Sequence, residues 1–118
     1  MTEQRWRVEC EIVKANLPNF YPFECSFGGG RRIYIGFKGL HEKRGKQYEI
    51  KVIAPKDTYP LRAPRVFITP TIDRGYLEAD GAVSIFKEWI PTRDTFANMT
   101  LIGIQYINEN MEGLWKSI

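Results

Sequence analysis

The sequence predicts an α+β fold in which helices pack on one antiparallel sheet. Three observations predict this class. Apolar residues recur every three or four positions at the start and near the end of the chain. Between those segments they alternate with polar residues, and the alternating segments follow one another on short turns, which join antiparallel neighbours. We therefore expect one domain over residues 1–118, ordered as helix, four-stranded meander, irregular loop region and helix.

A first helix is expected over about residues 2–15. Thr2 is a suitable N-cap, because its hydroxyl can accept a backbone N–H of the first turn. Pro18 limits the other end, since the residue before a proline avoids helical geometry. Residues at steps of four, three and four form its apolar stripe: Trp6, Cys10, Val13 and Leu17.

Three segments with a period of two are expected to be strands, around residues 23–27, 33–37 and 48–52, and residues 65–69 are expected to form a short fourth strand. Gly28-Gly29-Gly30 predicts a turn between the first two. The polar stretch "GLHEKRGK", residues 39–46, predicts a loop between the second and third.

A last helix is expected from about residue 98, although Gly103 weakens it. Its apolar positions follow steps of three and four: Leu101, Ile104, Ile107, Met111 and Leu114 or Trp115.

Composition excludes several classes of function. Hydrophobic residues make up 43% of the chain and charged residues 26%, which is typical of a folded soluble protein. A net charge of +3 is too small to indicate nucleic acid as a partner. No apolar run approaches the roughly 20 residues of a membrane span, and the N-terminus lacks a secretion signal, so we expect a cytoplasmic protein. With one histidine and two irregularly spaced cysteines, we expect no metal and no cofactor.

The segment over residues 53–96 contains few regular elements, and an irregular stretch of this length usually has a function. It begins as "IAPKDTYPLRAP", where three prolines favour a rigid connector, and the ring of Tyr59 should pack beneath it. Trp89 and Pro91 close the segment with a large side chain and a stiff turn.

The order of these features resembles the ubiquitin-conjugating enzyme (UBC-like) fold. The compact stretch "YLEADGAVSIF", residues 76–86, is similar to the bacterial branch of this family found in antiphage operons. The resemblance implies an activating enzyme, a ubiquitin-like modifier or the C-terminus of a nucleotidyltransferase, and protein targets as partners. The matching residues are Pro55, Tyr59, Pro60, Pro64, Val66, Phe67, Gly81, Val83, Ile85, Trp89 and Pro91.

The resemblance places the acyl acceptor at Ser84, where the family carries a catalytic cysteine. A serine hydroxyl is far more basic than a thiol and usually needs a general base, which the sequence does not assign. The family's His-Pro-Asn motif is absent near residues 72–76, and with it an oxyanion-stabilising asparagine, a group that normally contributes about 3 to 4 kcal/mol. Three explanations stay open: a native nucleophile that forms an oxyester, an engineered cysteine-to-serine trap, or an inert residue in a binding module of the inactive-variant or RWD type.

Other site residues have subordinate roles in this interpretation. Tyr76 and Asp80 are secondary catalytic candidates, although Asp80 with Gly81 is also a turn signal. The resemblance implies that a group of residues supports the Ser84 loop: Gly81, Trp89, Pro91, Tyr59 and Pro60. Basic residues on the first helix could dock an activating enzyme or could simply be solvated: Arg5, Arg7 and Lys14.

Overall fold

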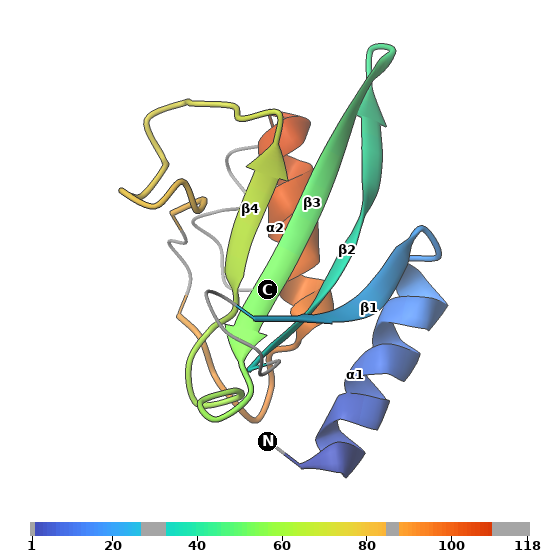
Figure 1. The fold of residues 1–118 in the computed structure, drawn as a ribbon. Coiled ribbons are helices and arrows are strands. Elements are labelled where there is room, and N and C mark those ends of the chain that lie inside the picture. The colour runs from blue at the N-terminus through green and yellow to red at the C-terminus, as the bar shows by residue number, and fades with distance from the viewer. Residues whose placement is uncertain (1, 27–32, 85–87, 110–118) are drawn as a thin grey trace.

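The computed structural model describes residues 2–26, 33–84 and 88–109, in which two helices pack on one face of a four-stranded antiparallel sheet (Figure 1). The strands lie in sequence order, β1-β2-β3-β4, as a meander requires. The α+β class and the order of elements are confirmed. The elements are α1 (Glu3–Asn16), β1 (Phe20–Cys25), β2 (Tyr34–Lys43), β3 (Lys46–Pro55), β4 (Arg65–Thr69) and α2 (Phe96–Ile107).

Helix α1 begins and ends within one residue of the expected bounds. The Thr2 hydroxyl accepts the Arg5 N–H at 3.1 Å, which confirms the N-cap. Val13 and Leu17 of the expected stripe are buried in the core. A charged residue, Glu9, is also fully buried on this helix, which the stripe did not predict.

The expected loop over residues 39–46 is wrong, because β2 and β3 continue through it and pair as far as Lys43 and Lys46. Only Arg44 and Gly45 lie between the strands. Both have positive φ, 52° and 79°, as in a type I′ hairpin turn, which needs only two residues. Polar residues occupy exposed hairpin positions here and do not interrupt the pairing. The expected turn at residues 28–30 lies outside the described residues.

The two faces of the sheet follow from the register, because residues directly opposite one another in an antiparallel pair share a face. The face toward the helices, the inner face, carries buried side chains such as Phe37 opposite Val52. The other face, the outer face, carries Phe23 opposite Gly36. The outer face also carries Tyr21, Lys38, Leu40, Glu42, Gln47, Glu49, Lys51 and Phe67.

Helix α2 begins two residues earlier than expected. Thr95 is its N-cap: its hydroxyl accepts the Asn98 N–H, and the Asn98 side chain accepts the Thr95 N–H at 2.9 Å. These reciprocal bonds form a capping box, which fixes the start of the helix.

The face of α2 that packs on the sheet differs in part from the expected one. Ile107 of the expected stripe is buried, as are Met99, Ile102 and Tyr106, whereas the expected Leu101 is 41% exposed. The helix is apolar around most of its circumference, so more than one series of three- and four-residue steps fits it. Gly103 faces the sheet, where a Cβ would lie 3.0 Å from an Ile50 methyl carbon, so its small size permits close approach. Positions 110–118, including the expected Met111, Leu114 and Trp115, lie outside the described residues.

A chain of aromatic rings connects the core to the irregular region. Trp6 and Phe96 both contact Phe37, with ring centroids 5.1 and 5.5 Å from it. The Phe96 ring lies 4.5 Å from that of Tyr59, and Tyr59 lies 6.0 Å from Trp89. Tyr59 is buried, as the sequence predicts. These contacts continue the core beneath the segment that carries the candidate site.

Candidate functional site

Ser84 lies at the end of a short hairpin over residues 76–84. Its backbone N–H donates to the Tyr76 carbonyl at 2.5 Å, and Leu77 and Val83 form an isolated antiparallel bridge. The fold therefore brings the backbones of Ser84 and Tyr76 together. The Ser84 side chain is half-buried.

The turn of this hairpin depends on Gly81. Its φ is +92°, a conformation that residues with a side chain rarely adopt. The Gly81 N–H donates to the Glu78 carbonyl at 2.9 Å, which closes the turn. Beyond it, the Val83 N–H donates to the Val66 carbonyl of β4 at 2.8 Å, so the hairpin is attached to the sheet.

Asp80 interacts with this turn and with β4. Its carboxylate accepts the Ala82 N–H at 3.1 Å and an Arg65 N–H at 2.7 Å, and Arg65 also contacts Glu78 at 2.6 Å. The Ala82 N–H, followed by the Arg65 guanidinium, lowers the pKa of Asp80. These contacts suit an ionised residue that shapes the hairpin.

Within the described residues, the Ser84 hydroxyl has no hydrogen-bonded general base. Residues 85–87, which follow it in the expected motif, lie outside those residues. Both cysteines are free thiols, Cys10 on α1 and Cys25 at the end of β1. Burial raises the pKa of the Cys10 thiol, which lowers its nucleophilicity at neutral pH.

Trp89 anchors the segment that follows the hairpin. Its indole N–H donates to the Pro60 carbonyl at 2.7 Å. The Tyr59–Pro60 peptide bond is cis, and the Tyr59 ring packs beside Trp89. Tyr59 and Pro60 of the proline-rich connector are therefore in direct contact with Trp89, at the end of the irregular region.

A buried group that the sequence reasoning missed joins α1 to the same region. We call Arg5, Glu9 and Tyr59 the Glu9 cluster. The Glu9 carboxylate accepts hydrogen bonds from the Tyr59 hydroxyl, from Arg5 Nε at 2.9 Å and from the Phe96 N–H at 3.1 Å. Burial, followed by the hydrogen bond to Glu9, raises the pKa of Tyr59, so its hydroxyl stays protonated and donates.

Arg5 extends this cluster to the turn after Trp89. Its guanidinium donates to the Pro91 carbonyl at 3.0 Å and to the Asp94 carbonyl at 2.9 Å. The buried Asp94 carboxylate in turn accepts the Ile90 N–H at 2.8 Å. One side chain of α1 thus holds two carbonyls of the segment that contains Pro91. The available sequence signal was Glu9 itself, which stands three residues after Trp6 and four before Val13, beside the apolar stripe.

The three basic residues expected to dock an activating enzyme differ in their surroundings. Arg5 has a side chain only 25% exposed and is engaged in the Glu9 cluster. Arg7 is largely exposed and contacts Glu3 at 3.5 Å, and Lys14 is exposed in the last turn of α1. Arg7 and Lys14 therefore belong to the accessible face of the helix, whereas Arg5 belongs to the interior.

The described ranges contain no helix with the length and apolar character needed to cross a bilayer. In the same ranges, no three His, Cys, Asp or Glu side chains come together as a possible metal site.

Comparison with known proteins gives a structural match. A solved structure of human ubiquitin-conjugating enzyme E2 G1 is similar to this chain, with a TM-score of 0.59 and 18% sequence identity, over 87% of this chain and 91% of that one. No family model and no curated protein matches the sequence. At this identity the likeness concerns the fold, so the expected UBC-like fold is confirmed.

Proposed function

We propose that this protein accepts the C-terminal acyl group of a ubiquitin-like modifier at Ser84 and transfers it to an amine of a protein target. The main support is the position of Ser84 on a hairpin attached to β4 in a UBC-like fold. The resemblance of residues 76–86 to the bacterial branch supports a cytoplasmic role in antiphage defence. In that setting the acyl donor is a modifier or the C-terminus of a nucleotidyltransferase.

The proposed reaction has two acyl transfers. In the first, the Ser84 oxygen attacks the modifier's thioester on an activating enzyme, an oxyester forms, and the enzyme's thiol leaves with the proton. In the second, a target amine attacks the oxyester, an amide forms, and the Ser84 hydroxyl is regenerated. An oxyester is less reactive toward amines than a thioester, so the second step is expected to be the slower one.

The surrounding residues have positioning roles in this proposal. Asp80, held by Arg65, and Gly81 keep the hairpin turn in shape, and the Tyr76 carbonyl fixes the Ser84 backbone. Trp89 and its contact with Pro60 support the following segment, together with Tyr59 and Pro91. The accessible face of α1, with Arg7 and Lys14, is the proposed docking surface for the activating enzyme.

A second candidate function is a non-catalytic binding module of the inactive-variant or RWD type. One observation favours it: within the described residues, no general base is hydrogen-bonded to the Ser84 hydroxyl. A serine without such a base is a poor nucleophile at neutral pH. In this alternative the protein binds a modifier or another partner without forming a covalent bond.

Intact-mass spectrometry after incubation with activating enzyme, modifier and ATP separates these functions. Native Ser84 should gain the mass of one modifier less one water, in an adduct that survives reducing agent and is cleaved by mild base, and Ser84→Ala should gain none. Loading of Ser84→Cys alone would identify residue 84 as a replaced or degenerate acceptor. If no variant is loaded while the activating enzyme itself carries the modifier, the binding-module function replaces the conjugating one.

A further inference from the structure

Four charged side chains on the outer face form no ion pair within the part of the chain that the structure describes. Lys38 on β2 lies directly opposite Lys51 on β3. In the next row along the strands Glu49 lies opposite Leu40, and one row further Glu42 lies opposite Gln47. Two positive and two negative charges therefore occupy neighbouring rows of one face.

Aromatic rings hold the two ammonium groups on this face. Lys38 Nζ lies 5.7 Å from the ring centroid of Phe23 and 6.0 Å from that of Tyr21. Lys51 Nζ lies 5.7 Å from the ring centroid of Phe67. Like charges directly opposite one another destabilise a sheet, so this pair costs stability in the free chain. A surface that bears carboxylates at matching positions would remove that cost.

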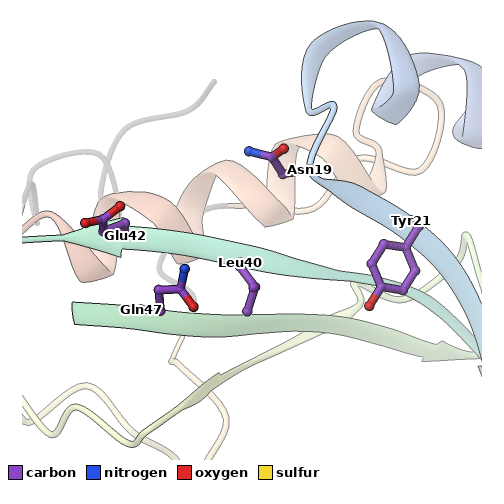
Figure 2. Close-up of a pocket in the computed structure, with 5 residues that line it drawn as sticks. All are labelled: Asn19, Tyr21, Leu40, Glu42 and Gln47. Carbon is purple, nitrogen blue, oxygen red and sulfur yellow. The ribbon is translucent and has the colours of Figure 1, made fainter. Parts of the chain in front are cut away.

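Exposed apolar surface lies beside these charges. Tyr21 and Leu40 are 55% and 51% exposed, which is high for large apolar side chains. Strand β1 pairs with β2 only as far as Gly39, so among the described residues no strand pairs with β2 on that side from Leu40 onward. A hollow of about 410 Å³ lies at this point. Figure 2 shows the residues that line it: Asn19, Tyr21, Leu40, Glu42 and Gln47. The face thus combines charges with apolar area that a second surface could cover.

We propose that the outer face binds the outer face of a second copy of this chain. A two-fold axis that crosses the strands between the rows of Lys51 and Glu49 places Lys51 of each copy opposite Glu49 of the other, and Lys38 opposite Leu40. The two residues are two positions apart on β3, or about 7 Å, so both ion pairs form at once. Sheets pack face to face at about 10 Å, a gap that a lysine and a glutamate side chain span together.

Charge complementarity favours a second copy over an acidic partner. An acidic surface would pair with Lys38 and Lys51 but would face Glu42 and Glu49 across the neighbouring rows. A copy of the same face offers both signs in reversed order, as an isologous interface requires. The interaction is independent of the chemistry proposed for Ser84.

Sedimentation velocity over about 5 to 500 µM protein tests this proposal, and wild type should show a monomer–dimer equilibrium that weakens with salt. Lys51→Glu and Glu49→Lys should each raise the dimer Kd by about tenfold or more, because each puts like charges opposite one another. A mixture of the two variants should dimerise again, because their charges are complementary. Lys14→Glu and Glu11→Lys on exposed positions of α1 make the same changes in net charge and should leave the Kd within about twofold.

Thermal unfolding of each variant distinguishes a loss of dimerisation from a loss of folding. Lys51→Glu should unfold at the same or a higher temperature than wild type, since it replaces the like-charge pair with Lys38 by an opposite-charge pair. A folded variant that fails to dimerise then reports on the interface. The proposal is overturned if wild type sediments as a monomer throughout, in which case the face is free for a different partner. A dimer unaffected by both charge reversals, or not restored by mixing, also overturns it.

Discussion

Arg5→Ala should destabilise the protein far more than its position near the chain terminus suggests. It leaves the Glu9 carboxylate, which is 0% exposed, without its cationic partner at 2.9 Å. Removing one partner of a buried ion pair costs about 3–5 kcal/mol. Because Arg5 is 25% exposed and Glu9 keeps its hydrogen bonds from Tyr59 and Phe96, we expect the lower end, about 3 kcal/mol. With an unfolding entropy near 2.1 cal/mol/K per residue, this corresponds to a fall in Tm of about 12 °C.

Urea and thermal unfolding of three variants test this reasoning. Arg7→Ala is the matched control, since it breaks an exposed pair with Glu3 on the same helix and should cost at most about 0.5 kcal/mol. Adding Glu9→Gln to Arg5→Ala should restore about 1–2 kcal/mol, because an amide is less costly to bury without a partner than a charge. If Arg5→Ala costs no more than Arg7→Ala, the free energy assigned to the Glu9 cluster is wrong.

Three further predictions concern the hairpin and its support. Because the pKa of Asp80 is lowered in the folded state, its ionised carboxylate stabilises the fold at pH values above the ordinary aspartate pKa, and this stabilisation is lost as the pH falls through the lowered value. In Arg65→Ala, NMR titration should find a higher Asp80 pKa than in wild type. An unchanged Asp80 pKa would exclude the contact with Arg65. Gly81→Ala should cost about 1–2 kcal/mol in urea unfolding from its φ alone, because no atom lies within 4 Å of the added carbon. Trp89→Phe should cost at least about 1 kcal/mol by the same measurement, through loss of the hydrogen bond to Pro60, and a smaller loss would argue against its anchoring role.

Local signals with a stereochemical cause predicted the elements well. The hydroxyl of Thr2 fixed the start of α1, and alternation located the start of β2 and the central residues of β3. The hairpin from β2 to β3 was misjudged because polar composition does not distinguish a loop from an exposed strand pair, whereas the positive φ of Arg44 and Gly45 does. The face of α2 was misjudged at Leu101, although not at Ile107, because Leu101 and Ile102 are both apolar and only packing on the sheet decides between them.

The candidate site was predictable only in part. The sequence predicted one site region for Tyr76, Ser84 and Trp89 because these residues are close along the chain. It could not reveal that Arg5 and Glu9, fifty or more residues earlier in the chain, contact Tyr59 and the turn at Pro91, since no local pattern encodes contacts between distant segments. A carboxylate beside an apolar stripe was the one available sign of that contact.

The attachment of the hairpin to β4 also has a consequence for solubility. Strand β4 ends the sheet, and an uncovered edge strand can pair with other chains and cause aggregation. The hairpin lies along the free side of β4, where its Val83 N–H occupies the Val66 carbonyl (Figure 1). At the opposite edge, Pro22 in β1 removes a backbone donor. The segment that presents Ser84 therefore also shields the sheet from intermolecular pairing, so changes that detach it should lower solubility before they unfold the core.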